Sequence, residues 1–371
     1  MIWDEKQIRP AGLAAEPRSV TSPSAFEVMR GCMYRSGLER DPLYKRDRFP
    51  SPQIVIGNAT HKLKEIATRG DLGGLSQAER KSAAATLWEE EITKGRSGMV
   101  ALALEEPPQP EGWPNYQKNR IYAIKDVELS TSTHGFADSD FSANPEVLLN
   151  AHDGAITGRV DLIRETADGV EIIDYKTGEL AEPGSEAAGE PRLKSGYRRQ
   201  LLLYAYLYHA RFGIWPIMVA AQKANGRQSF SFSPSHSESE ALAAEALNLL
   251  NQYNQGAKTG TLQASPSPDG CRFCPFKAAC PSFFEAADED WDLGGRFSVR
   301  GKVASMSHST RLVTLETTDG NARQGPTHIG RIPKEFFDHR SVGDTVSFTD
   351  LIGDPSKGLS FLWWSRSWKW P

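Results

Sequence analysis

An acid and a base lie two residues apart in an otherwise apolar stretch of this chain. The stretch Val170–Gly178 reads V-E-I-I-D-Y-K-T-G, with Asp174 and Lys176 on either side of Tyr175. Alternate residues of a strand point to one face, so the spacing predicts that the acid and the base share a face. Carboxylates bind Mg²⁺ or Mn²⁺. A nearby ammonium can orient or help to deprotonate a metal-bound water, or offset charge on a phosphorane-like transition state. The same pattern is also typical of a solvated hairpin with an ion pair.

Two further residues can join such a cation site. G-R-V-D-L-I contains Asp161, and the turn signal E-T-A-D-G follows it, which predicts a hairpin that places Asp161 opposite Asp174 and Lys176. I-V-I-G-N-A-T-H-K places His61 one turn beyond Gly57, early in a predicted helix. Imidazole binds Mn²⁺-type metals and can act as a general base, although a lone histidine is more often structural.

A polar pair follows on a later predicted helix. Gln200 and Tyr204 are four residues apart, so they share a helix face. An amide and a phenol there can hold phosphates or position the lysine. The alternative is a polar edge on a core helix, because Leu201, Leu203 and Leu207 form an apolar face beside them.

The four cysteines form a second candidate centre. Cys271, Cys274 and Cys280 have C-x₂-C-x₅-C spacing, and Cys32 is the remaining one. So few cysteines in a large chain do not make a disulfide scaffold, and their crowding points to metal or catalysis. By count, four thiolates suit Zn²⁺ or a [4Fe-4S] cluster equally well.

Composition sets broad limits on the class of protein. The chain has 371 residues, 39% hydrophobic and 24% charged, with a net charge of −4. No apolar run is long enough for a membrane span, and the N-terminus lacks a signal-peptide core, so we expect a cytoplasmic protein with no membrane partner. The net charge gives no sign of a nucleic-acid partner, which would need a local basic patch such as residues 192–199. No Walker A motif is present, so the chain is not itself a helicase.

The periodicity predicts a two-part organisation. Helices are expected at 24–38, 57–69, 77–94, 196–212 and 236–255, and strands at 155–164, 169–175 and 214–222. The proline-rich residues 105–120 predict a loop, and from about Arg120 the pattern predicts β structure. An acidic break at 285–292 predicts one domain over 1–290 and a small all-β domain over 291–371. Short alternating runs in the latter predict a barrel, first of all an OB-like one. Its aromatic residues predict either base stacking or burial against the first domain.

The ordered set G-x-x-x-H, G-R-V-D, I-I-D-Y-K-T-G and Q-L-L-L-Y resembles the RecB-like branch of the PD-(D/E)XK nuclease superfamily. Each motif is weak alone, and their order over about residues 20–285 carries the resemblance. It implies an α/β fold, a restriction-endonuclease-like mixed sheet flanked by helices. It also implies a metal-dependent deoxyribonuclease that hydrolyses phosphodiester bonds of single-stranded DNA or DNA ends, with exonuclease action favoured over endonuclease action.

The resemblance also implies roles for single residues. The implied Mg²⁺ or Mn²⁺ ligands are His61, Asp161, Asp174 and the backbone carbonyl of Tyr175. The implied catalytic set is Asp161, Asp174, Lys176, Gln200 and Tyr204. Members of the family can use one more acid upstream of the first core strand, and here Glu128 and Glu146 are both candidates.

A remote first cysteine followed by a C-terminal triplet resembles the iron–sulfur-bearing subset of these nucleases, including AddB-type subunits and CRISPR-adaptation nucleases. The resemblance implies a [4Fe-4S] cluster held by Cys32, Cys271, Cys274 and Cys280, with zinc as the alternative. Such a cluster is structural and closes a loop of more than 230 residues. The implied setting is DNA repair, recombination or phage defence, beside a separate helicase or ATPase subunit.

A second hypothesis is a non-catalytic DNA-binding or scaffolding subunit of a helicase–nuclease or defence complex. An inactivated relative would be expected to lose an acid or the lysine. The sequence retains Asp161, Asp174 and Lys176, which argues for activity.

Overall fold

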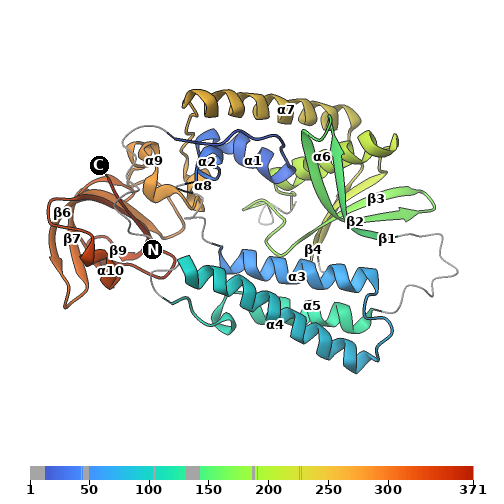
Figure 1. Ribbon diagram of the computed structural model, residues 1–371, viewed down its shortest axis with the longest axis horizontal. Helices are drawn as coiled ribbons and strands as arrows, with labels where there is room; N and C mark the ends of the chain where they lie inside the picture. Colours follow the sequence, from blue (N-terminus) through green and yellow to red (C-terminus); the bar gives the residue numbers. More distant parts are fainter. Residues whose placement is uncertain are drawn as a thin grey trace.

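The computed structural model describes residues 13–42, 44, 50–102, 106–130, 143–185, 189, 191–224, 226 and 228–370. It contains two regions (Figure 1): a mixed sheet between helices, and a β-barrel near the C-terminus. We call the first the sheet region and the second the barrel. This α/β architecture confirms the predicted fold class.

The sheet region is built on five strands in the order β1-β2-β3-β4-β5. They are β1 (Ala143–Ala151), β2 (Ile156–Thr166), β3 (Gly169–Lys176), β4 (Met218–Lys223) and β5 (Ser229–Phe232). The first three form an antiparallel meander, β3 and β4 are parallel, and β4 and β5 are antiparallel. The predicted hairpin of β2 and β3 is therefore present, and the sheet is mixed.

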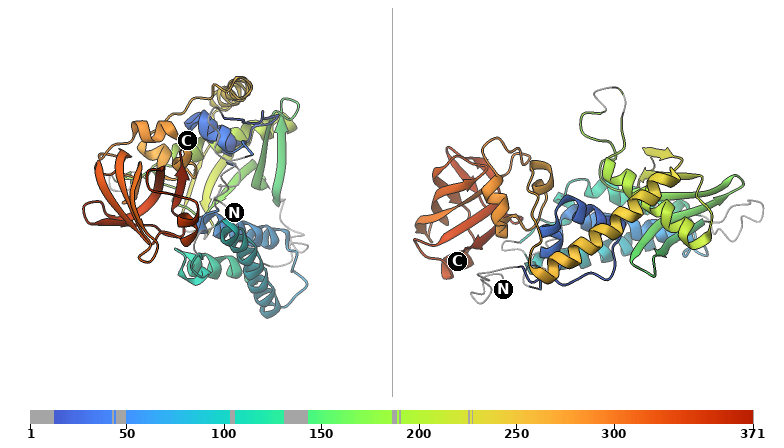
Figure 2. Two further views of the ribbon diagram at one scale, coloured as in Figure 1. Left: turned by 60° about the vertical axis from the view of Figure 1, so that its left-hand side comes forward. Right: turned by 90° about the horizontal axis from the view of Figure 1, so that it is seen from above.

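One face of this sheet is covered by α6 (Ser195–Phe212), which packs against β1 to β4. α1 (Pro23–Gly31) and α7 (His236–Thr259) pack in turn against α6, as the view from above shows (Figure 2). Gly158 of β2 allows this contact to be close, because a Cβ there would lie 2.8 Å from Leu207 and 2.9 Å from Tyr204. The glycine of the G-R-V-D motif thus brings α6 onto the strand that carries Asp161.

A three-helix bundle lies across from α1, α6 and α7 (Figure 1), and it is formed by α3 (Pro52–Arg69), α4 (Gln77–Leu102) and α5 (Tyr116–Leu129). α3 begins at Pro52, where the side chain of Ser51 accepts from the Ile54 N–H and proline occupies the first helical turn. The prediction of a helix start at Gly57 was therefore too late by more than one turn.

The expectation of β structure from about Arg120 was wrong, because α5 already begins at Tyr116. The prolines at 107, 108, 110 and 114 predicted a loop to residue 120, but the irregular stretch holds one short 3₁₀ turn, η3 (Pro110–Gly112), and gives way to α5 at Tyr116. Tyr116 is buried against Trp88 and Trp113, with ring centroids 5.9 and 6.4 Å apart. Tertiary packing of these rings supports a helix that local pattern did not indicate.

The segments that carry the cysteines are short. α2 (Met33–Leu38) follows α1 after a break at Cys32, so the single helix predicted for 24–38 is two. After α7, the chain forms α8 (Pro268–Arg272), η5 (Lys277–Ala279) and α9 (Pro281–Ala286). These elements lie between the sheet region and the barrel (Figure 1).

The barrel strands are β6 (Phe297–Ser307), β7 (Leu312–Gly320), β8 (Gly325–Gly330), β9 (Thr345–Asp354), β10 (Gly358–Ser360) and β11 (Arg366–Lys369). The first five close into a ring in the order β6-β7-β8-β10-β9-β6, and β11 pairs with β9. β8 and β10 are parallel, and α10 (Lys334–Asp338) lies between β8 and β9 in the chain. The prediction of a small β-barrel at this end of the chain is confirmed, and the barrel is closed and has five strands.

The C-terminal aromatic side chains join the barrel to the sheet region. Phe361 is fully buried in the barrel core. Trp363 packs against the core of the three-helix bundle, and Trp370 meets Phe284 of α9 edge to face, with centroids 6.0 Å apart. Trp368 stacks on Tyr44 at 5.3 Å. The alternative of burial against the first domain therefore describes these rings better than free stacking platforms.

Within the described segments, none of the helices combines the length and the apolar character that crossing a membrane requires.

Candidate active site and cysteine centre

Strand β3 places Asp174 and Lys176 side by side. Lys176 Nζ lies 2.5 Å from Asp174 Oδ2. Asp174 is only 3% exposed, and Val170 and Ile172 anchor the strand in the main core. The predicted shared face is present, and the pair is not a solvated surface hairpin.

Helix α6 supplies the next contacts. Lys176 Nζ donates to Gln200 Oε1 at 3.0 Å, and Gln200 Nε2 lies 3.3 Å from Asp174 Oδ1 and 2.9 Å from the Tyr204 hydroxyl oxygen. Gln200 therefore touches the acid, the base and the phenol at once. Its amide fixes both charged groups of β3, and Tyr204 fixes the amide.

Asp161 lies where β2 and β3 separate. The ladder between these strands ends at the pair Leu162 and Ile173. Beyond it, Asp161 Oδ2 accepts from the Tyr175 N–H at 2.6 Å, so the carboxylate replaces a backbone acceptor. This hydrogen bond holds one oxygen of Asp161 in place beside the Asp174–Lys176 pair.

Three side chains with metal-binding atoms gather around the same carboxylate. Ligand atoms of His61, Glu146 and Asp161 all lie within 4.8 Å of one another. His61 Nδ1 is 3.4 Å from Asp161 Oδ1. Gly57, one turn earlier on α3, lies next to Thr177, since a Cβ there would be 3.5 Å from its hydroxyl oxygen. Asp174 is not one of the three and instead pairs with Lys176.

Of the two upstream acids, only Glu146 lies at this place. The β1–β2 register puts it directly opposite Asp161, between the pairs Pro145–Leu162 and Val147–Val160. Its backbone is left-handed, with φ 55°, which is unusual for a glutamate in a strand. Glu128 lies on α5, where its carboxylate bonds to Gln77 and ion-pairs with Lys81. A positive φ has no sequence signal in glutamate, so the choice needed the structure.

The charges on β3 are strongly coupled. Burial raises the pKa of Asp174 to about 6, an effect that Lys176 opposes and Asp161 reinforces. For Lys176, burial is the largest single effect and disfavours the ammonium, but the charge and hydrogen bond of Asp174 together with the charge of Asp161 outweigh it and raise the pKa of Lys176. The lysine is therefore held as a cation.

The acids around His61 also repel one another. Burial raises the pKa of Glu146, and the neighbouring charges of Asp161 and Glu65 add to the rise. Burial alone would lower the pKa of His61, but the hydrogen bond and charge of Asp161 together with the charge of Asp174 outweigh burial and raise the pKa of His61. A bound divalent cation would relieve this repulsion between the acids.

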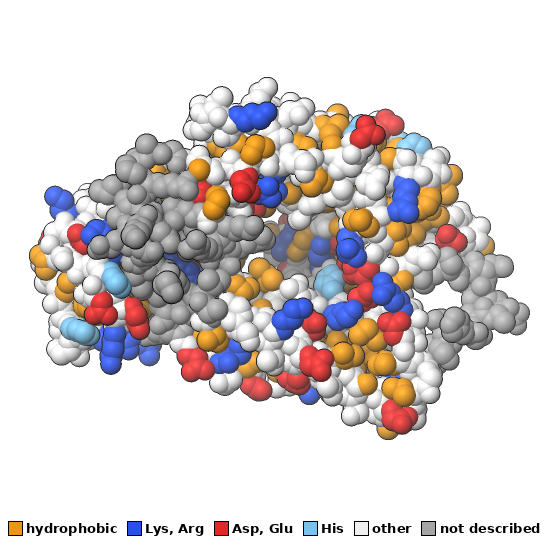
Figure 3. Space-filling view, viewed as in Figure 1, with side chains coloured by type: hydrophobic (Ala, Val, Ile, Leu, Met, Phe, Trp, Pro, Cys, Tyr) orange, Lys and Arg blue, Asp and Glu red, His pale blue; other side chains and the backbone are white. Residues whose placement is uncertain are grey.

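A hollow opens between the helices above and the three-helix bundle below, and basic and histidine side chains are visible inside it (Figure 3). Tyr197 on α6 was not predicted as a site residue. Its ring lies under two ammonium groups, Lys176 Nζ at 5.0 Å and Lys194 Nζ at 5.7 Å from the centroid. Its position three residues before Gln200, on the same helix face, was the available signal.

The basic patch at 192–199 is largely neutralised within the protein. Arg199 forms a two-pronged ion pair with Glu27 of α1, at 2.7 and 2.6 Å. Arg198 forms another with Glu238 of α7. These two arginines join α6 to its neighbours, so they are structural in this state.

All four cysteines line one small cavity, although Cys32 comes from the start of α2 and the other three from α8 to α9. The Cys32 sulfur accepts from the Arg35 N–H at 3.4 Å and the Ser265 N–H at 3.5 Å. The cavity therefore joins chain segments that are 233 positions apart.

Burial raises the pKa of Cys274 to about 11 and of Cys280 to about 12. Buried thiols without a metal stay protonated at neutral pH, whereas a metal requires thiolates and releases the protons. Four sulfur donors at one enclosed place fit a thiolate-bound metal group.

Comparison with known proteins gives a family. The model of the PD-(D/E)XK nuclease superfamily matches residues 20–281. Among solved structures, a candidate exonuclease from Eubacterium rectale is similar at 12% identity and a TM-score of 0.37, covering 67% of this chain and 84% of its own. The protein SSO0001 is similar at 14% identity and a TM-score of 0.28, covering 62% and 94%. Curated protein sequences gave no match.

Proposed function

The chain belongs to the PD-(D/E)XK nuclease superfamily, and from that membership we propose that it is a metal-dependent deoxyribonuclease. The observation that carries this proposal is the convergence of Asp174, Lys176 and Gln200 beside the group of His61 and Asp161. Two acids and an ammonium from β2 and β3, an imidazole from α3 and an amide from α6 meet at one place. That set is what hydrolysis of a phosphodiester requires.

We propose His61, Asp161, Asp174 and the Tyr175 carbonyl as the ligands of Mg²⁺ or Mn²⁺. Glu146 would be the additional upstream acid. Their oxygen and nitrogen atoms and the mutual repulsion of the acids fit a hard divalent cation. Such a cation supplies a water of lowered pKa and charge neutralisation at the phosphate.

The role that fits Lys176 best is electrostatic. Its raised pKa keeps it an ammonium, which is suited to offset negative charge on the pentavalent phosphorus and poorly suited to remove a proton. Gln200 holds the ammonium at 3.0 Å, and the ring of Tyr197 lies beneath it. Those contacts orient the charge before substrate binds.

The finer assignment is to the RecB-like branch, with single-stranded DNA or DNA ends as substrate and exonuclease action. Its support is the arrangement of the Q-x-x-x-Y pair, because Gln200 contacts Lys176 at 3.0 Å and Tyr204 contacts Gln200 at 2.9 Å. We also propose two domains, 1–290 and 291–371. Work beside a helicase or ATPase subunit in repair or defence remains part of this proposal.

For the cysteine centre we propose a [4Fe-4S] cluster. A tetrahedral Zn²⁺ with bonds of about 2.3 Å would bring its sulfurs to about 3.8 Å from one another. Among the described residues, no three cysteine sulfurs lie mutually within 4.8 Å. Cluster thiolates bind separate iron atoms and stand further apart, which suits this wider spacing of the sulfurs. A brown protein absorbing near ~400 nm is expected, and a colourless, zinc-loaded one would contradict the cluster.

The substrate is tested by digestion of end-labelled linear DNA and of circular DNA, each single- and double-stranded. Reactions contain Mg²⁺, Mn²⁺ or a chelator. We expect linear single strands to be degraded from an end, only with metal, while single-stranded circles persist. Cutting of circles would contradict exonuclease action. No cleavage of any substrate with either metal would contradict the nuclease and favour a scaffolding subunit.

A further inference from the structure

One lysine in the cysteine segment is buried without an evident role in catalysis. Lys277 lies between Cys274 and Cys280 in the sequence and is 1% exposed. Lysine is almost never fully buried unless it is paired, because an ammonium loses its hydration there. Its partners therefore show what the burial serves.

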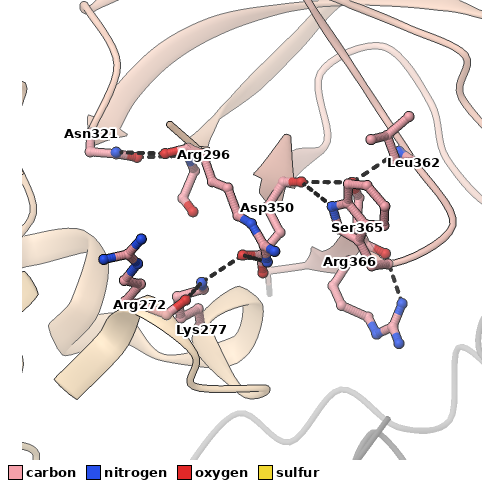
Figure 4. A network of polar contacts seen from close by, with 10 residues as sticks. Arg272, Lys277, Arg296, Asn321, Asp350, Leu362, Ser365 and Arg366 are labelled. Carbon is pink, nitrogen blue, oxygen red and sulfur yellow. Dashed lines mark hydrogen bonds and ion pairs between the residues drawn. The ribbon is translucent and has the colours of Figure 1, made fainter. Parts of the chain in front are cut away.

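Those partners are in two regions of the protein. Lys277 Nζ ion-pairs with Asp350 Oδ1 of the barrel strand β9 at 2.8 Å, and donates to the Arg272 carbonyl in α8 at 2.9 Å (Figure 4). The same residue lines the cavity that the four cysteines share. One ammonium thus lies between the cysteine cavity and the barrel.

The barrel holds the Asp350 carboxylate in position to pair with Lys277. Asp350 has a left-handed backbone, with φ 59°, in the middle of β9. Its carbonyl accepts from Trp364 Nε1 at 3.1 Å and from the Ser365 hydroxyl at 3.0 Å, and its carboxylate also receives Arg296 at 3.3 Å. These contacts fix the carboxylate against Lys277.

Neutral contacts surround the ion pair. Ser347 of β9 donates its hydroxyl to the Ala278 carbonyl at 2.6 Å, and both groups are buried. η5, which holds Lys277, packs against β9 and β11. The cysteine segment is therefore a structural part of the barrel interface.

We propose that Lys277 couples the cysteine centre to the docking of the barrel. Four thiolates around Zn²⁺ or around a [4Fe-4S] core leave a net double negative charge, which the buried ammonium offsets on one side while it pairs with Asp350 on the other. The centre holds in place the cysteine segment against which β9 and β11 pack. Because such coupling is reciprocal, barrel docking strengthens metal binding at the centre by the same free energy by which bound metal strengthens barrel docking.

This inference rests on the proposed thiolate centre, and its test follows metal and structure separately. The variant is Asp350→Asn in the full-length, metal-loaded protein, because asparagine tolerates a left-handed backbone and keeps the shape. Asp354→Asn is the matched control, the same change on the same strand, because within the described part of the chain that carboxylate contacts the neighbouring Lys357 and Ser356 and no group of the cysteine segment. Lys277→Met is a second variant that removes the charge from the other side.

The readouts are the rate of metal loss to a chelator and hydrogen exchange of β9. We expect Asp350→Asn and Lys277→Met to release metal about tenfold faster than Asp354→Asn, within the usual range of coupling between sites. Removal of the metal from the wild-type protein should speed hydrogen exchange in β9. Equal release by all three variants, or unchanged exchange in β9, overturns the coupling alone. A wild type that binds no thiolate metal overturns the proposed centre as well.

Discussion

The carboxylate–lysine cluster and the cysteine centre differ in how the chain builds them. The first comes from two strands and two long helices, and its side chains already contact one another. The second comes from short helices and turns at both ends of the sheet region. A preformed polar cluster on rigid elements suits chemistry, whereas a set of donors that joins remote segments suits cross-linking. Variants at the two places should therefore affect different properties of the protein.

The largest expected effect is on stability. Cys32→Ser removes the one ligand that is remote in sequence, so the free energy of unfolding should fall by about 3–5 kcal/mol, as for loss of a cross-link across a long loop. Denaturant unfolding measures it, with metal-stripped wild type as the matched control. A variant as stable as loaded wild type would contradict a stapling role.

The next effect is on rate. Lys176→Met removes the ammonium from the cluster, and cleavage should slow about 10²–10³-fold, as when one transition-state donor is lost. Lys62→Met, on the exposed side of α3 beside Glu65, should cleave like wild type. Single-turnover cleavage of labelled DNA measures both. Equal rates for the two variants would remove Lys176 from the chemistry.

The sequence predicted the side chains that meet between β3 and α6, but it left the choice between Glu128 and Glu146 open and did not predict the burial of Lys277. Asp174, Lys176 and Gln200 follow from periods of two and four, which local structure enforces. The position of Glu146 depends on a left-handed backbone, and the burial of Lys277 depends on a barrel aspartate 73 positions away. Neither the backbone conformation nor the long-range ion pair leaves a pattern in the neighbouring sequence. The helix α5 was missed for the same reason, since buried aromatic packing decides it.

A smaller effect separates the two upstream acids. Glu146→Gln should raise the metal concentration needed for half-maximal cleavage by about tenfold, in the range found for residues that support a metal site. Glu128→Gln should leave it unchanged, because that carboxylate contacts Gln77 and Lys81 instead. Metal titrations of the cleavage rate make the comparison. The reverse outcome would move the site toward α5.

The smallest effect is on pH dependence. The pKa of Asp174 is raised to about 6, above its unfolded value of about 3.9, so its ionisation opposes folding of the protein without divalent metal. The stability it contributes is full below about pH 4 and is lost as pH rises through about 6. Between pH 5 and 7, wild type should lose about 1 kcal/mol more than Asp174→Asn in unfolding experiments. Parallel losses in the two proteins would contradict this.

The central claim is that cleavage belongs to the carboxylate–lysine cluster and not to the cysteine centre. Its most direct test measures DNA cleavage and thiolate-bound metal in the same preparations of wild type and Asp174→Ala. We predict that the variant loses cleavage in Mg²⁺ or Mn²⁺ while its cysteine-bound metal stays at the wild-type level. Wild-type cleavage no faster than that of the variant would contradict the account.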